Sequence, residues 1–217
     1  MSHLETEAAK AVVEAVEKEE GRMAPKKRLA ILAALDCFSE TGFDGTSTKM
    51  IAQRAGIGEA TIFRHFPTKR DLLLRLAAPV IRHILTPAAE QQAVALLDQH
   101  RDEPRLILRE VMLSRLAFMT HYEPLVRILF QEALVNRELR DLIVAEATPL
   151  FQQLTEVVGI MGPVTPTDRE RFFRTVGSLI AGYFIHRSIL QPERDWDDAA
   201  EVDGMLAILF DGIGPKG

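Results

Sequence analysis

The distribution of apolar residues has helical periodicity along almost the whole chain. Apolar side chains recur every three or four positions, and we find no convincing stretch with the two-residue alternation of a half-buried strand. Prolines, glycines and capping residues divide the pattern into separate helices. We therefore expect an all-α fold, with a kink or a break at Pro149. The predicted helices span residues 4–20, 26–41, 49–55, 59–66, 69–85, 88–100, 105–120, 124–135, 138–157, 168–190 and 197–210.

The helix predicted for residues 26–41 has the clearest apolar face. Pro25 suits the first turn of this helix, and Gly42 suits the position just after its end. Cys37 lies beside the apolar face, where a cysteine is most often a small core residue. We expect the following side chains to point inward: Leu29, Ile31, Leu32, Leu35 and Phe38.

The first residues of the chain carry much less apolar surface. Residues 4–20 are rich in alanine, glutamate and lysine, with a thin stripe of valines at positions 12, 13 and 16. A helix of this kind is weakly anchored, and chain termini often fray. We therefore expect residues 1–22 to form an acidic, weakly ordered N-terminal extension.

Residues 47–66 contain two short predicted helices joined by a tight turn, which is the arrangement of a DNA-binding helix-turn-helix. Ser47 can cap the first helix, Gly56 can form the turn, and Pro67 ends the second helix. The small shared core would consist of Ile51, Ala52, Ile57 and Ile62. The alternative is an ordinary corner between two helices, which is common in helical proteins.

The longer string of residues 42–72, GFDGTSTKMIAQRAGIGEATIFRHFPTKRDL, resembles the DNA-binding region of the TetR (tetracycline-repressor-like) family. Many positions at fixed spacing match, so the pattern is far more specific than a lone degenerate motif. The resemblance is carried by Phe38, Gly42, Phe43, Thr46, Ser47, Ile51, Ala52, Ala55, Gly56, Ile57, Thr61, Ile62, Phe63, His65, Phe66, Lys69 and Leu72.

This resemblance implies a three-helix head with a helix-turn-helix, followed by a larger C-terminal helical bundle for ligand binding and dimerisation. The expected divisions are the extension at residues 1–22, the DNA-binding domain at 23–68 and the ligand-binding and dimerisation domain at 69–217. The residues after the head resemble the family only in length and helical character.

The recognition helix of a helix-turn-helix meets base edges with its N-terminal residues, which here are Gly58, Glu59, Ala60 and Phe63. Glu59 can accept a hydrogen bond from the amino group of cytosine, and Ala60 and Phe63 can pack on thymine methyl groups. Glu59 could equally serve only to stabilise the first turn of the helix.

A second group of residues is expected to contact phosphates, which fixes the register without reading sequence. The resemblance implies this role most directly for Thr61, His65 and Lys69. The expected phosphate contacts are Thr48, Lys49, Thr61, Arg64, His65 and Lys69.

The sequence departs from the family pattern at two of these positions. Phe63 stands where the family commonly has tyrosine, and Gly58 stands where it commonly has a capping serine. Both changes affect the expected sequence preference rather than binding itself. Residues 26–28 (Lys, Lys, Arg) could contact the DNA backbone or the minor groove, or could be an ordinary solvated basic segment.

The charge distribution agrees with a head that binds phosphates. The chain carries a net charge of −5, but residues 22–75 hold ten lysines and arginines against five acidic residues. Residues 1–21 hold two lysines against six glutamates, and the rest of the chain is also acidic on balance. A basic head on an acidic body favours one end of the molecule for nucleic acid.

The body is expected to hold a small-molecule effector, which would bind among soft apolar side chains and a few polar groups. The polar residues within otherwise apolar predicted helices are Arg115, His121, Glu132, Asn136 and His186. The predicted pocket consists of Met112, Arg115, Leu116, Met119, Phe130, Leu134 and Phe173.

The last two predicted helices suit a homodimer, because two helices from each chain can form a symmetric four-helix interface. The alternative is a buried hairpin within one chain. The predicted interface residues are Phe172, Val176, Gly177, Leu179, Ile180, Tyr183, Met205 and Leu209.

Other functional classes have less support. The chain shows no glycine-rich phosphate loop, no nucleophile elbow and no cluster of metal-ligand residues, although Glu110 and Glu132 could act as acid and base. The single cysteine excludes an internal disulfide, and no apolar run is long enough for a membrane helix.

We therefore expect a cytoplasmic regulator rather than an enzyme, with no cofactor, no metal and no membrane partner. Its expected partners are a double-stranded, pseudo-palindromic operator, a small and largely apolar effector, and a second copy of the chain. A DNA-binding architectural protein without an effector is the other reading of the sequence.

Overall fold

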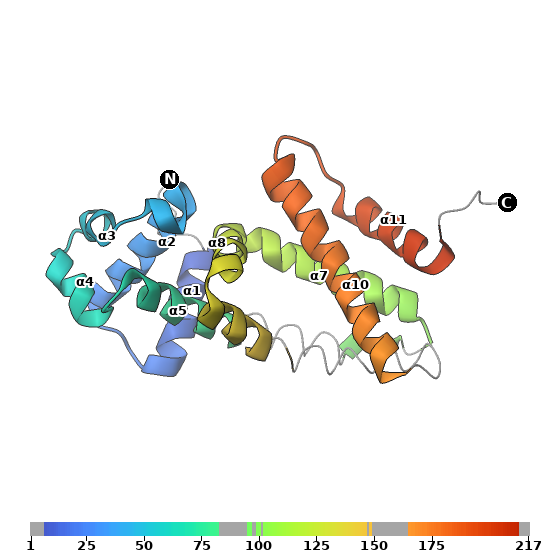
Figure 1. The fold of residues 1–217 in the computed structure, drawn as a ribbon, viewed down its shortest axis with the longest axis horizontal. Coiled ribbons are helices and arrows are strands. Elements are labelled where there is room, and N and C mark those ends of the chain that lie inside the picture. The colour runs from blue at the N-terminus through green and yellow to red at the C-terminus, as the bar shows by residue number, and fades with distance from the viewer. Residues whose placement is uncertain are drawn as a thin grey trace. The chain divides into compact units, whose positions relative to one another are not determined.

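The computed structural model describes residues 7–82, 95–96, 99–100, 102–146, 148 and 165–212, and the regular structure within these residues is helical (Figure 1). The expected all-α fold class is confirmed. The chain divides into two compact units. Unit 1 contains the described residues up to 82 and from 122 to 146, and unit 2 contains the remaining described residues.

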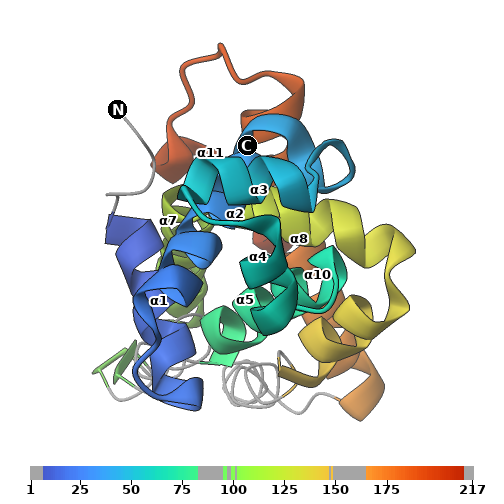
Figure 2. The ribbon, with the colours of Figure 1, turned by 90° about the vertical axis from the view of Figure 1, so that its left-hand side faces the viewer.

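Unit 1 is built around α2 (Pro25–Gly45), which packs against α1, α3, α4, α5 and α8. Figure 2 faces this unit and shows α1 running alongside α5. The surrounding elements are α1 (Glu7–Glu20), α3 (Thr48–Ala55), α4 (Glu59–His65), α5 (Lys69–Val80), α8 (Glu123–Val135) and the helical residues 137–146.

The local signals of α2 act as predicted. Pro25 lies in its first turn, and Gly42 interrupts the regular helix with a φ of 72°, a left-handed value that glycine adopts without strain. The inward face is correct for Ile31 and Phe38, but Leu29 is 44% exposed. The helix buries its small residues Ala30, Ala33 and Ala34 instead, because α2 has neighbours on several sides and small side chains permit close approach.

The expectation of a weakly ordered extension is wrong for residues 7–20. They form α1, and the side chains of Val12, Val13 and Val16 are at most 2% exposed within the core of unit 1. The valine stripe is narrow, but it suffices because it packs on α5 and α2 rather than standing alone. Residues 1–6 lie outside the described residues.

The compact unit also extends past the predicted boundary at residue 68. Leu72, Leu73 and Leu76 of α5 are fully buried in the core that contains Ile31 and Phe38. Leu125 and Ile128 of α8, and Leu139 after it, join the same core. A head of three short helices has little apolar surface to bury, so α1, α5 and α8 complete it.

Unit 2 consists of α7 (Pro104–His121), α10 (Pro166–Ile185), the π-helical turn η3 (His186–Leu190) and α11 (Asp198–Asp211). The predicted ranges 105–120, 168–190 and 197–210 match these elements closely. Both α10 and α11 pack on α7. Their shared core is formed by Leu108, Met112, Leu116, Val176, Ile180, Tyr183, Val202 and Leu206.

A polar network fixes the start of α11 within unit 2. Asp198 accepts hydrogen bonds from the Tyr183 hydroxyl at 2.7 Å and from Nη1 of Arg187 at 2.8 Å. Arg187 also donates to the Thr120 hydroxyl at 2.7 Å, which ties α7 to the same point. Among the described residues, no helix is long and apolar enough to cross a membrane. The helix predicted for residues 88–100 and the break at Pro149 fall largely or wholly outside the described residues.

The packing of α1 predicts a measurable contribution to stability. We expect Val13→Ala to lower the free energy of unfolding by about 2 kcal/mol, because it removes two buried carbon atoms and leaves a small cavity. Glu14→Ala is the matched control on the exposed face of the same helix, and we expect it to change stability by no more than roughly 0.5 kcal/mol. Urea unfolding followed by circular dichroism measures both. Equal stability of the two variants would contradict the packing of α1.

Candidate nucleic-acid interface

The helix-turn-helix begins and ends at the residues that the sequence predicts. The Ser47 hydroxyl accepts a hydrogen bond from the backbone N–H of Met50 at 3.1 Å and caps α3. Gly56 ends α3 with a φ of 65° and allows the tight turn. Gly58 starts α4 without a side-chain cap, as its missing side chain requires. Thr68 then caps α5 in a reciprocal capping box with Asp71.

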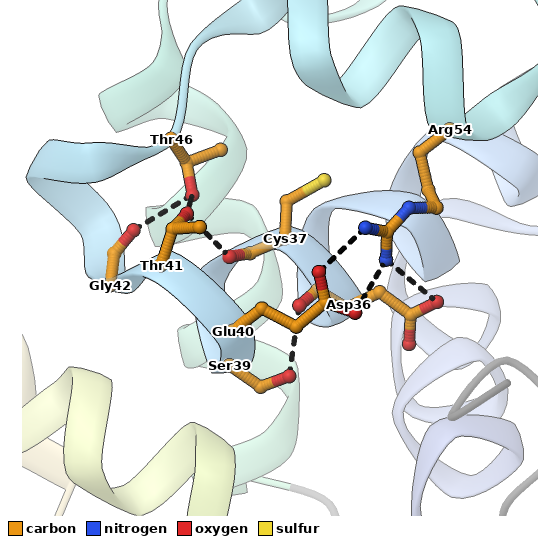
Figure 3. A network of polar contacts seen from close by, with 8 residues as sticks. All are labelled: Asp36, Cys37, Ser39, Glu40, Thr41, Gly42, Thr46 and Arg54. Carbon is orange, nitrogen blue, oxygen red and sulfur yellow. Dashed lines mark hydrogen bonds and ion pairs between the residues drawn. The ribbon is translucent and has the colours of Figure 1, made fainter. Parts of the chain in front are cut away.

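An ion-pair network fixes α3 on α2 (Figure 3). The two terminal nitrogens of Arg54 donate to the two carboxylate oxygens of Glu40 at 2.9 and 2.6 Å. Arg54 also lies 3.7 Å from the carboxylate of Asp36, which is only 3% exposed. The hydrogen bond to Glu40 is the largest cause that raises the pKa of Arg54. This network was not predicted from the sequence, although Asp36 and Glu40 are four residues apart and therefore share a helix face.

The loop that leads from α2 into α3 is held by threonine hydroxyls (Figure 3). Thr46 is 2% exposed and donates to the carbonyl of Gly42 at 2.7 Å, and Thr41 donates to the carbonyl of Cys37 at 2.9 Å. The two hydroxyls lie 2.8 Å apart. Cys37 is a buried core residue as expected, and burial raises the pKa of its thiol.

Lys69 supports the same loop. Its ammonium group donates to the carbonyls of Phe43 at 2.5 Å and Thr46 at 2.8 Å, and lies 4.2 Å from the centre of the Phe43 ring. An ammonium group has three donors, so these bonds leave one hydrogen for a phosphate. The predicted phosphate contact therefore also has a structural role, which the sequence motif alone did not reveal.

A carboxylate of α8 lies near Lys69. Glu132 is 7% exposed, and burial and then Asp44 raise its pKa, while the nearby positive charge of Lys69 lowers it. The next turn of the chain contributes Asn136, whose side-chain oxygen accepts from Nη2 of Arg70 at 2.8 Å and from the backbone N–H of Leu139 at 3.1 Å. The first residues of α5 thus contact the end of α8.

The recognition helix α4 is anchored by fully buried Ile62 and followed by fully buried Phe66. Its outward side carries exposed Ala60 and Arg64, and Phe63 is 47% exposed. Thr61 and His65 are half-buried. Lys49 of α3 is exposed, and neither Lys49 nor Arg64 forms an ion pair with a described residue.

Two of the predicted DNA-binding residues contact each other. The Thr48 hydroxyl donates to Oε1 of Glu59 at 2.7 Å and so connects the first residue of α3 to the first residue of α4. At the start of α2, Lys26 and Arg28 are exposed, whereas Lys27 forms an ion pair with Glu20 of α1. Residues 26 and 28 are therefore the exposed basic residues of that segment.

The predicted effector residues are divided between the two units. Met112, Leu116 and Phe173 are buried in unit 2, where Met119 is partly buried. Arg115 is half-buried, donates to the Ser114 hydroxyl at 3.0 Å, and has its pKa lowered by burial. Phe130 and Leu134 belong to α8 of unit 1 and are 37% and 81% exposed. These residues therefore do not line one wall within a single unit.

The polar residues that the sequence places within apolar helices are also divided between the two units. His121 and His186 are exposed in unit 2, while Glu132 and Asn136 are buried in unit 1. Unit 1 contains a separate hollow of about 240 Å³ that includes none of the predicted pocket residues. It is lined by Glu19, Glu20, Leu74, Arg75, Ala78, Pro79, Glu138 and Leu142.

The predicted dimer residues fall into two groups by burial. Val176, Ile180 and Tyr183 are 5–8% exposed because they pack in the core of unit 2 within one chain. Gly177 remains exposed. Phe172, Leu179, Met205 and Leu209 are partly buried at the margin of that core. The apolar residues of α10 thus lie on the face that packs within unit 2 and also on its outer face.

Comparisons with known proteins agree with this geometry. The sequence profile of bacterial regulatory proteins of the tetR family matches residues 30–76. The HTH-type transcriptional regulator YvkB of Bacillus subtilis is 27% identical over 168 residues, which cover 76% of this chain and 84% of the relative. The tetracycline repressor protein class D of Escherichia coli is 44% identical over 52 residues, which cover 24% of each chain.

The similarity in fold extends over most of the chain. The structure of the transcriptional regulator FadR from Bacillus subtilis in complex with stearoyl-CoA has a TM-score of 0.60 and 20% identity, covering 87% of this chain and 100% of that one. The proteins that this chain resembles are transcriptional regulators, not enzymes. The matched motif, the helix-turn-helix and the helical C-terminal part together support a regulator of the TetR family.

Proposed function

We propose that the protein is a transcriptional repressor that binds a pseudo-palindromic operator as a homodimer and leaves it when a small, largely apolar ligand binds. The observation that carries the proposal is the exposed outer surface of α3 and α4, two helices that α2 holds in place. A regulator that binds an operator in this way would act in the cytoplasm.

The exposed side chains of the helix-turn-helix support operator binding. Ala60 and Phe63 offer apolar contacts for thymine methyl groups in the major groove. Lys49 and Arg64 are exposed cations that can pair with phosphates on either side of the groove. The third hydrogen of the Lys69 ammonium group could bind a DNA phosphate only beside the loop before α3, because Lys69 already holds that loop. Lys69 would therefore fix the position of α3 along the DNA backbone.

The outer face of unit 2 supports a homodimer. At Gly177 and Gly182 of α10 and Gly204 of α11, nothing beyond the chain neighbours and the helix's own backbone lies within 4 Å of the position that a Cβ would occupy. Ile208 of α11 is 57% exposed. Small residues permit close approach of helices from a second copy, and a two-fold axis would bring the same face of each chain together.

The proposed effector would bind in unit 2. Its apolar residues include Met112, Met119 and Met205, and methionine adapts its shape to varied apolar ligands. FadR of Bacillus subtilis, whose fold is similar, was crystallised with stearoyl-CoA.

The path from the effector to the operator would include α8. This helix follows α7 of unit 2 in the chain, and it packs on α2 and contacts the start of α5 through Asn136 and Arg70. Movement of α8 would therefore displace Lys69 and the loop before α3. Leu73, Leu76 and Val80 of α5 are buried in unit 1.

The first test is selection of binding sites from a random duplex library. We expect a pseudo-palindrome whose half-sites are one helical turn, or a multiple of it, apart. Lys49→Ala should weaken binding to all sequences and reduce the slope of log K against log salt by about 0.9, the value for one phosphate contact. Lys18→Ala, an exposed lysine of α1, is the control. An unchanged slope for Lys49→Ala would remove this residue from the phosphate contacts.

The second test concerns the homodimer. Gly182→Glu should fold, because its surroundings within one chain are open, but it should give monomers that bind the operator weakly. Ala117→Glu adds the same side chain at an exposed position of α7 and should leave the dimer intact. Sedimentation velocity measures both variants, and a dimer of Gly182→Glu would exclude α10 from the interface.

The third test is the linkage between ligand and operator. Titrations with stearoyl-CoA as the first probe, followed by other apolar ligands, are compared with and without operator DNA. A ligand that releases the operator must bind more weakly to the DNA complex by the same factor, equivalent to about 1–3 kcal/mol.

A variant tests the path through α8. Arg70→Ala should reduce the linkage between ligand and operator while leaving the affinity of the free protein for ligand unchanged, because it removes the bond to Asn136. Arg137→Ala is the control, since the Arg137 side chain is 85% exposed. Equal affinity for ligand with and without DNA would leave a DNA-binding protein that is not an inducible repressor.

A further inference from the structure

A hydrogen bond between Thr48 and Glu59 joins the first residue of α3 to the first residue of α4, the two helices proposed to face the operator. The donor is the Thr48 hydroxyl, the acceptor is Oε1 of Glu59, and the distance is 2.7 Å. Both residues are half-buried, so the bond is partly shielded from solvent. The second oxygen of Glu59, Oε2, has no hydrogen-bond partner among the described residues.

The bond restricts what Thr48 can do at the DNA. A threonine hydroxyl has a single hydrogen to donate, and a phosphate oxygen accepts hydrogen bonds but donates none. While the hydroxyl donates to Glu59, it therefore cannot donate to a phosphate. This arrangement differs from the phosphate contact that the sequence predicts for Thr48.

The same bond determines how Glu59 can be used. A carboxylate offers only acceptors, and a bond to one oxygen limits rotation about the terminal torsion of the side chain. The free oxygen then points in a restricted direction from the first residue of α4, where a recognition helix meets base edges. We propose that Thr48 is a positioning residue that orients Glu59, and that Glu59 selects cytosine at one position of each half-site.

The choice of cytosine follows from the groups that each base presents in the major groove. Guanine and thymine present acceptors, which repel a carboxylate. Adenine presents its amino donor beside the N7 acceptor, whereas cytosine presents its amino donor alone. An acceptor-only side chain is therefore satisfied best by cytosine. This inference rests on the proposed operator binding and adds the source of its sequence preference.

The experiment uses the full chain and the operator found by selection, with all four base pairs placed in turn at each position of the half-site. Wild type is expected to prefer cytosine at one position by on the order of tenfold. Glu59→Gln replaces one acceptor by a donor and should shift the preference at that position to adenine, because an amide matches the N6 and N7 groups of adenine.

Thr48 variants test the positioning role. Thr48→Val keeps the shape of the side chain but removes the hydroxyl, and it should reduce the cytosine preference several-fold at the same position. Thr48→Ser keeps the donor and should retain the preference. In the double variant Thr48→Val/Glu59→Gln, loss of the hydroxyl should have no further effect on cytosine preference. Thermal melting by circular dichroism checks that each variant is folded.

The outcomes separate the inference from the proposed function. If Thr48→Val weakens all sequences equally and leaves the base preference intact, Thr48 contacts the DNA backbone and the inference is overturned. A base preference that Glu59→Gln leaves unchanged also overturns it. If no sequence is enriched from the library, the proposed operator binding fails and the inference fails with it.

Discussion

Two helices too short to be stable alone must be held rigidly if they are to present a fixed surface to DNA, and this constraint governs the structure of unit 1. Helices shorter than about 12–15 residues are marginal in water. Within their own bounds α3 buries Ile51 and Ala52, and α4 buries Ile62. Their positions therefore depend on α2, which supplies the core beneath them and the carboxylates that bind Arg54.

The need for support explains why unit 1 is larger than the motif that defines it. The three valines of α1, the leucines of α5 and the apolar face of α8 all enter one core with α2. Polar contacts then fix the parts that this core does not reach. Lys69 binds the carbonyls before α3. The ion pair of Glu20 with Arg75 connects α1 to α5. The ion pair of Glu19 with Arg82 connects α1 to the chain just after α5.

The proposed regulation would depend on the same construction. An element that completes the core of the DNA-binding unit cannot move without affecting the surface that the core supports. The helix α8 has this property, because it carries Ile128 into the core and Glu132 and Asn136 to the first turn of α5. The proposed transmission through α8 would use packed side chains and hydrogen bonds already present.

Local signals in the sequence determined much of the fold. Ser47, Gly56, Pro67 and Thr68 end or begin helices where they were expected to, because capping and turn formation depend on the residue itself and its immediate neighbours. The spacing of the matched positions likewise indicated a resemblance to the TetR family, since a helix-turn-helix needs small and apolar residues at fixed intervals.

Only the tertiary structure decided which residues from distant segments of the chain contact each other. The valines of α1 become core because α2 and α5 offer a surface for them, and Lys69 binds carbonyls because α5 starts beside the end of α2. Thr48 and Glu59, assigned from sequence to different groups of DNA contacts, form a hydrogen bond because the turn at Gly56 brings the starts of α3 and α4 together. Such pairings depend on the path of the chain through space, which periodicity and capping signals do not encode.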